Sequence, residues 1–203
     1  MRLIGHSWGA MLAAAYMGQH PDRVSQAVLA EPGALDNAGL ARFRERQTGA
    51  QGFAYYRLLA PTIFEAFRVD GPDADARMDY IFGKMSANFV NTAASGYRCE
   101  NAGIVPVPPE VPVPPARFGA KAFNTLFGPE ADLSPIAAHA GNFAGDVLFL
   151  ASACNSFTGA ALQREQMGLF PQAQLAVIPD AGHEMFSDNP TASIAAVRTF
   201  FGQ

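Results

Sequence analysis

The sequence predicts an α/β layer fold, in which parallel strands are flanked by helices and a long helical insertion divides the sheet. Short apolar runs alternate with helical patterns at both ends of the chain. Continuous apolar runs are typical of parallel strands that are covered on both faces. The region from residue 36 to 142 lacks this alternation and carries aromatic, helical-looking stretches instead. A layered sheet with a cap-like insertion accounts for both observations.

The first strand-helix unit lies at the start of the chain. Residues 1–5 match the end of a buried strand, and residues 10–19 have apolar side chains at helical spacing up to a His-Pro pair. A second strand is expected within residues 24–30, before a Glu-Pro-Gly turn. Neither a turn nor a signal peptide precedes the first strand, which leads us to expect a piece of a longer protein.

Alternation resumes after the insertion. Residues 147–151 and 175–178 are expected to be strands, and residues 159–169 and 190–201 helices. Asn189 is expected to cap the last helix, with a proline at its first position. We therefore divide the chain into core residues 1–35, a helical cap at 36–142, and core residues 143–203.

A proline-rich run at residues 105–115 is expected to be extended polyproline II, as a stiff linker across the cap. A ligand for an aromatic groove is the alternative function for this run.

Composition limits the classes of function. The 203 residues are 49% hydrophobic and carry a formal net charge of −4. A mildly acidic chain without a basic run has no electrostatic footprint for nucleic acid or for an anionic membrane. Cys99 and Cys154 are too few for a disulfide framework and fit a reducing compartment, so we expect a cytoplasmic protein. Their spacing and the scattered histidines predict no metal site, and we expect no cofactor.

The pentapeptide Gly5-His6-Ser7-Trp8-Gly9 fits the G-x-S-x-G pattern of a nucleophile elbow. It lies between a predicted strand and a predicted helix, which is the context that this motif requires. Small residues beside the serine let strand and helix pack closely. The Trp8 backbone N–H, at the start of the helix, can donate to a developing oxyanion. The pattern indicates Ser7 as a nucleophile.

A serine hydroxyl needs a general base, and His183 is the candidate. It lies between the last predicted strand and the last predicted helix, where a loop can reach the carboxyl edge of the sheet. His6 is held beside the elbow, His20 ends a helix, and His139 lies near the end of the cap. These three are poorer candidates.

The residue that orients His183 stays open, chiefly between two positions, and a residue elsewhere or none at all is the remaining alternative. The usual chain order expects a carboxylate after the strand that ends at Ala151, but no Asp or Glu follows there. Asn155 is nearest in position and could accept the Nδ1–H bond, although an amide lacks the charge that stabilises an imidazolium. Glu31, at the end of the second strand, is the alternative. We favour Asn155 because the acid usually follows this strand.

The region from Leu3 to Ala13, followed by Tyr16 and a His-Pro pair, resembles the elbow region of α/β-hydrolases of the proline iminopeptidase type. The tryptophan after the serine is typical of that group, and the Gly182-His183 loop is similar too. The resemblance covers residues 1–35 and 143–203. It implies an α/β-hydrolase fold with a helical cap and an acyl-enzyme mechanism on amides or esters. Asn155 departs from the aspartate of that family.

Two hypotheses follow from these residues. The first is a serine hydrolase, possibly amino- or iminopeptidase-like, that acts on a small-molecule or peptide substrate and is represented by its C-terminal half. Such enzymes carry further strands and a second oxyanion donor before the elbow. The second hypothesis is a catalytically impaired remnant, or a binding protein that retains the fold.

Overall fold

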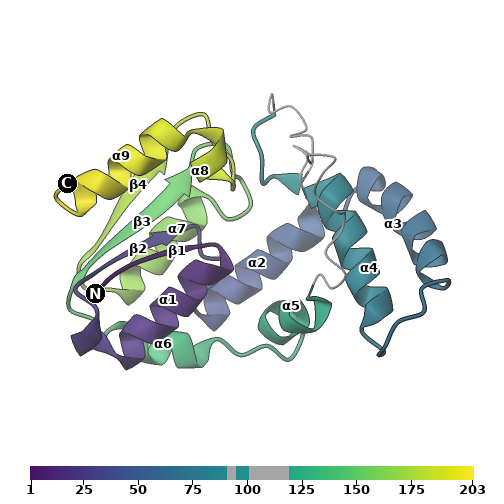
Figure 1. The fold of residues 1–203 in the computed structure, drawn as a ribbon, viewed down its shortest axis with the longest axis horizontal. Coiled ribbons are helices and arrows are strands. Elements are labelled where there is room, and N and C mark those ends of the chain that lie inside the picture. Colours follow the sequence, from purple (N-terminus) through teal and green to yellow (C-terminus); the bar gives the residue numbers. More distant parts are fainter. Residues whose placement is uncertain (91–94, 101–118) are drawn as a thin grey trace.

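The computed structural model describes residues 1–90, 95–100 and 119–203 (Figure 1). Within these residues, four strands form one parallel sheet in chain order. They are β1 (Arg2–His6), β2 (Gln26–Ala30), β3 (Asp146–Ser152) and β4 (Ala173–Ile178). The proline-rich run at 105–115 lies outside the described residues.

Helices cover both faces of this sheet (Figure 1). On one face, α1 (Trp8–Gln19) and α6 (Ser134–Ala140) pack into a core cluster together with Leu29 and Phe149 of the sheet. On the other face, α8 (Met185–Asp188) and α9 (Pro190–Phe200) pack over Val28 and Leu150. Successive side chains along each strand therefore contact opposite helical layers.

The two central strands are apolar from residue 27 to 30 in β2 and from 147 to 151 in β3, as is typical of parallel strands covered on both faces. Ala27 and Leu29 of β2 face the α1 side, and Val28 and Ala30 face the α9 side; all four are fully buried. Residues 147–152 of β3 are buried in the same way. This confirms the prediction that continuous apolar runs form a parallel sheet.

The insertion is helical. Figure 1 shows α2 (Asn37–Gly49) running away from the sheet towards α3 (Phe53–Ala66) and α4 (Ala76–Met85). A π-helical turn (Ser86–Val90) follows α4, and α5 (Ala120–Phe127) precedes α6. However, α6 packs directly on α1, and Leu40 of α2 joins the same core cluster. The division into core and cap at residues 36 and 142 stays a prediction.

Predicted and observed elements differ mainly at their ends. The expected helix at 159–169 is α7 (Ala160–Gln166) followed by a 3-10 turn (Met167–Leu169), and a further 3-10 turn (Pro21–Arg23) follows α1. The cap of α9 is confirmed, since the Asn189 side chain accepts from Ala192 N at 3.1 Å and Pro190 begins the helix. No helix among the described residues is both long and apolar enough to cross a bilayer.

Candidate active site

Ser7 lies in a strained turn between β1 and α1. Its backbone φ of 54° and ψ of −120° are a combination that residues other than glycine rarely adopt. The turn is tight because β1 and α1 touch at Gly5, where a Cβ would lie 2.4 Å from the carbonyl oxygen of Gly9. A Cβ on Gly9, in contrast, would meet open space. Of the two small residues in the motif, Gly5 is the one that close packing requires.

The sheet delivers two of the candidate residues to the same edge. Ser7 N donates to Ala30 O at 2.8 Å, and Glu31 N donates to Leu150 O at 3.0 Å. His6 is paired with Ala30, and Ala30 with Leu150, at the ends of β1, β2 and β3. The two hydrogen bonds continue this pairing by one residue beyond the strands. Glu31 also has a positive φ, of 44°. Each chain thus turns sharply on leaving the sheet, at the carboxyl edge where parallel α/β proteins bind ligands.

His183 is oriented by Glu31. The Nδ1 atom lies 2.8 Å from Glu31 Oε2, and the Glu31 side chain is fully buried while that of His183 is 14% exposed. A carboxylate only accepts hydrogen bonds, so this contact fixes the proton on Nδ1. The lone pair of neutral His183 then lies on Nε2, which is the atom that a general base uses.

The Glu31 carboxylate has three further donors. Ser152 at the end of β3 donates from its backbone N at 2.6 Å and from its hydroxyl at 2.5 Å to Oε1. Asn155 Nδ2 donates to Oε2 at 2.7 Å. A buried carboxylate is costly unless such donors surround it. Here the end of β3 and the loop after it supply them.

The structure places Asn155 against Glu31 and not against His183. Besides its bond to Glu31, its Nδ2 donates to Thr158 Oγ1 at 2.9 Å, and its Oδ1 accepts from the backbone N–H groups of Phe157 and Thr158. From this loop, Thr158 Oγ1 lies 3.5 Å from His183 Nδ1. The contact that we expected Asn155 to make with His183 is therefore made by Glu31.

His6, next to Ser7, holds the loop that carries His183. Its Nε2 lies 2.8 Å from the carbonyl oxygen of His183, and because a carbonyl only accepts, this nitrogen carries the proton. The two imidazole rings lie 4.8 Å apart. Among the described residues, the structure records no hydrogen bond between Ser7 Oγ and the His183 ring. In enzymes without substrate, such contacts are often longer than in the reacting complex.

Trp8 is the first residue of α1, so its backbone N–H has no acceptor within the helix. This N–H directly follows Ser7 in the elbow. A strand-turn-helix elbow, a histidine on the loop after β4 and a buried carboxylate thus meet at one edge of the sheet. A model of the α/β hydrolase fold matches residues 2–190. The chain belongs to the α/β-hydrolase family.

Solved structures agree with this assignment. The α/β-hydrolase chain is 25% identical to Rv0554 from Mycobacterium tuberculosis, with a TM-score of 0.54, over 99% of this chain and 65% of that one. A proline iminopeptidase from Mycobacterium smegmatis is 15% identical, with a TM-score of 0.55, over 100% of this chain and 64% of that one. A thermophilic esterase from Thermogutta terrifontis is 18% identical, with a TM-score of 0.50, over 99% and 64%. The chain therefore spans slightly less than two thirds of the length of these proteins.

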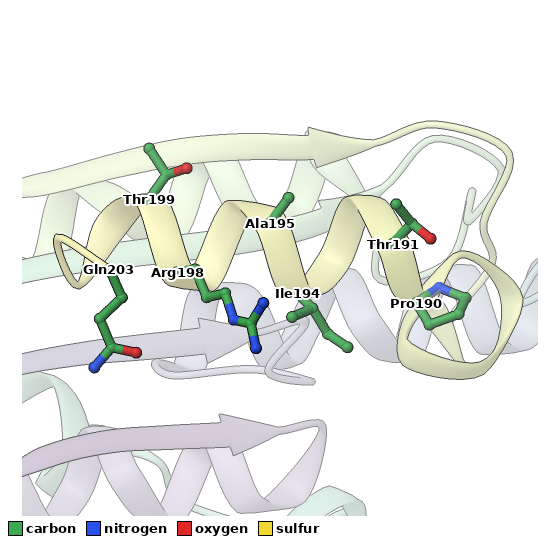
Figure 2. Close-up of a pocket in the computed structure, with 7 residues that line it drawn as sticks. All are labelled: Pro190, Thr191, Ile194, Ala195, Arg198, Thr199 and Gln203. Carbon is green, nitrogen blue, oxygen red and sulfur yellow. The ribbon is translucent and has the colours of Figure 1, made fainter.

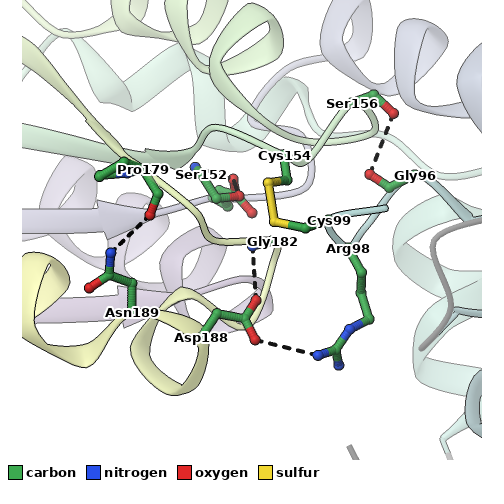
Figure 3. The surroundings of a disulfide bond; sticks show 11 residues. Gly96, Arg98, Cys99, Ser152, Cys154, Ser156, Pro179, Gly182, Asp188 and Asn189 are labelled. Carbon is green, nitrogen blue, oxygen red and sulfur yellow. Dashed lines mark hydrogen bonds and ion pairs between the residues drawn. A yellow bond between two sulfur atoms is a disulfide. The ribbon is translucent and has the colours of Figure 1, made fainter. Parts of the chain in front are cut away.

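The two cysteines of this α/β-hydrolase are joined, which differs from the expectation that they fit a reducing compartment. Cys99 and Cys154 form a disulfide, although 55 residues separate them in the sequence (Figure 3). They meet because residues 95–100 of the insertion lie against the loop that follows β3. The cytoplasmic location stays a prediction, and the cysteines no longer support it.

A pocket lies along α9 (Figure 2). It is lined by Pro190, Thr191, Ile194, Ala195, Arg198, Thr199 and Gln203. None of the candidate catalytic residues contributes to this lining. Among the described residues, no group of three or more His, Cys, Asp or Glu side chains could hold a metal ion.

Proposed function

We propose that this α/β-hydrolase chain carries the catalytic residues of a serine hydrolase that cleaves ester or amide bonds through an acyl-enzyme. The observation that supports this best is the contact of 2.8 Å between His183 Nδ1 and the buried carboxylate of Glu31, at the sheet edge where the Ser7 elbow ends β1. A serine, a histidine and a carboxylate in these roles form a catalytic triad, which is defined by geometry and not by chain order.

The roles follow from the hydrogen bonds. Ser7 Oγ attacks the carbonyl carbon of the substrate while His183 Nε2 takes the hydroxyl proton, and the carbonyl π electrons move onto the oxygen. Glu31 stabilises the imidazolium that forms, because its negative charge lies against Nδ1–H. Collapse of the tetrahedral intermediate expels the alcohol or amine, to which His183 returns the proton. Water then releases the acyl group by the same sequence of steps.

Asn155 is proposed to position Glu31 and not to act on the base directly. Its amide donates to the same oxygen, Oε2, that His183 uses, and its own carbonyl is held by two backbone N–H groups. An amide fixed in this way restricts the carboxylate to one rotamer. The loop after β3, which carries the acid in the family pattern, thus supports an acid that comes from β2.

Trp8 N–H is proposed as one donor to the oxyanion. In the family pattern the second donor comes from a loop that precedes the elbow strand. Removal of one such donor typically lowers the rate by about 10²–10³. The described residues therefore supply the nucleophile, base and acid, together with one half of the oxyanion hole.

A second candidate function is a non-catalytic or impaired protein that retains the hydrolase fold and binds a small molecule or peptide. The observation that favours it is that, within the part of the chain that the structure describes, His183 is hydrogen-bonded through Nδ1 to Glu31 but its ring has no hydrogen bond to Ser7 Oγ. The two candidates predict opposite results for covalent modification of Ser7.

The test uses a fluorophosphonate probe, which reacts only with a serine that an adjacent base activates. We expect wild-type protein to be labelled at Ser7, as located by peptide mass spectrometry, and Ser7→Ala to stay unlabelled. Ser156→Ala, in an exposed serine of the loop after β3, is the matched control and should label like wild type. Equal labelling of wild type and Ser7→Ala would remove Ser7 from the mechanism. A folded wild-type protein that the probe does not label would support the binding protein.

A further inference from the structure

Residues 95–100, a short segment of the insertion, lie against the two loops that carry the site (Figure 3). The Cys99–Cys154 disulfide joins this segment covalently to the loop after β3, one residue before Asn155. Two residues further along that loop, Ser156 N donates to Gly96 O at 2.9 Å. Gly96 has a φ of +78°, and a Cβ there would lie 2.6 Å from Ser156 Oγ. The segment therefore follows the loop of Asn155 at close range.

The same segment contacts the base through Tyr97. The backbone N–H of His183 donates to Tyr97 O at 2.7 Å. The Tyr97 ring stacks on Phe157 at 4.6 Å between centroids and meets the His183 ring edge-on at 5.0 Å. Burial, and then the charge of Glu31, raise the pKa of Tyr97 well above its usual value. The ring therefore remains a neutral spacer between the two loops.

The backbone of the loop that carries His183 lies directly against the backbone of residues 95–100. A Cβ on Gly182 would lie 2.5 Å from Tyr97 O and 2.8 Å from Arg98 Cα. Arg98 also forms an ion pair with Asp188 at 3.4 Å, and Asp188 Oδ2 accepts from Gly182 N at 2.8 Å (Figure 3). The loop that carries His183 is thus bonded to the segment by its backbone and, through Asp188, by a side chain.

We propose that residues 95–100 form a clasp that positions His183 and the loop of Asn155, and that the Cys99–Cys154 disulfide keeps this clasp closed. The inference rests on the proposed function for the roles of these residues. Its consequence is an activity that depends on thiol redox state. A dithiol such as dithiothreitol supplies the two electrons that break the S–S bond, which leaves two protein thiols and a cyclic oxidised dithiol. The sequence has two cysteines, both in this bond, so a thiol reductant has one target.

The kinetic test compares the oxidised and reduced protein on a chromogenic ester. Displacement of a base by about 1 Å can lower turnover by about 10²-fold. We expect reduction to lower kcat by about 10- to 100-fold with little change in KM, since the clasp contacts the base. Re-oxidation with glutathione disulfide should restore kcat. The matched control is the Cys99→Ser/Cys154→Ser double variant, which should have the low kcat of the reduced protein and no response to either reagent.

A second readout does not depend on activity. Hydrogen exchange, followed by mass spectrometry, reports on the amides of His183 and Ser156, which donate to the clasp. Their peptides should exchange faster after reduction, and peptides of β3 should not change. Faster exchange without any labelling of Ser7 by fluorophosphonate would support the clasp and overturn the proposed function. Unchanged exchange in both peptides, or labelling of Ser7 at the same rate in both redox states, would overturn the clasp.

Discussion

Four donors surround the buried carboxylate of Glu31, from the end of β3, the loop after it and the loop after β4. At the scale of single residues, this arrangement requires a charged carboxylate at Glu31, both to pair the four donors and to stabilise a protonated His183. An uncharged replacement would leave donors of Ser152, Asn155 or His183 unpaired in a buried site, and unpaired buried donors are costly. It would also remove the anion that an imidazolium needs.

We expect Glu31→Gln to lower kcat/KM on a chromogenic ester by about 10⁴, the scale observed when a triad carboxylate becomes an amide. The control is Glu184→Gln, because Glu184 is the neighbour of His183 and its side chain is exposed. That variant should retain wild-type kinetics. Equal, small effects of both changes would mean that another group orients the base.

Asn155→Asp separates the two candidates for the acid. If Asn155 oriented His183, a carboxylate there would raise activity. In the arrangement described above, the new carboxylate would instead replace a donor 2.7 Å from Glu31 and repel it. We expect kcat/KM to fall by about 10- to 100-fold, from the loss of a hydrogen bond to a charged group. A rise in kcat/KM would return the orienting role to Asn155.

At the scale of elements, the contact between β1 and α1 determines the geometry of the elbow. The two glycines of the motif differ in surroundings, since a Cβ on Gly5 would collide with the backbone of Gly9 and Ala10, and a Cβ on Gly9 would meet nothing within 4 Å. The motif therefore contains one glycine required by packing and one that packing does not require.

Gly5→Ala should lower the free energy of unfolding by about 1–3 kcal/mol, because the added methyl forces β1 and α1 apart. Gly9→Ala is the matched change, and it should raise the free energy of unfolding by up to about 1 kcal/mol, because alanine favours a helix more than glycine does. Urea unfolding followed by circular dichroism measures both. Similar losses in the two variants would contradict the packing argument.

The elements were predictable because their signals are local. Apolar runs indicate β2 and β3, and a His-Pro pair indicates the end of α1. The residue that contacts His183 Nδ1 was harder to predict than the helices and strands. Its choice depends on the register that places Ala30 beside Leu150 and so carries Glu31 to Ser152. The sequence favoured two positions for the residue that orients His183, and the pairing of strands separates these two.

At the scale of the whole molecule, β1 is an edge strand of the described sheet and pairs with β2 alone. Its face on the α9 side is open, with Ile4 56% exposed and Ile194 of α9 46% exposed. An unpaired strand edge beside apolar side chains is a template for association with another chain. This edge leads us to expect that residues 1–203 associate with another chain there.

We expect residues 1–203, expressed alone, to self-associate at micromolar concentration, as measured by size-exclusion chromatography with light scattering. Ile4→Lys should raise the monomer fraction, since a charge on an edge strand opposes pairing. Val177→Lys, at an exposed position of β4 on the opposite edge, controls for added charge and should change little. A wild-type monomer with a sharp cooperative melt would contradict the role of the β1 edge.

The disulfide was the feature furthest from sequence reasoning. Two cysteines carry no pairing signal, and their contact depends on how residues 95–100 lie against the loop after β3. Tyr97 was missed for the same reason, because its contacts with His183 and Phe157 come from elements far apart in the chain.

The position of this bond decides what a single proteolytic cut would do. A protease that cleaves once between Cys99 and Cys154 produces two polypeptides, of which the first carries Ser7 and Glu31 and the second carries His183. The bond between the sulfurs would keep the polypeptides together as a two-chain protein. On a denaturing gel, such a product runs as one band until a reductant separates it into two. Ser7 and His183 would then belong to different polypeptides that are still one covalent molecule.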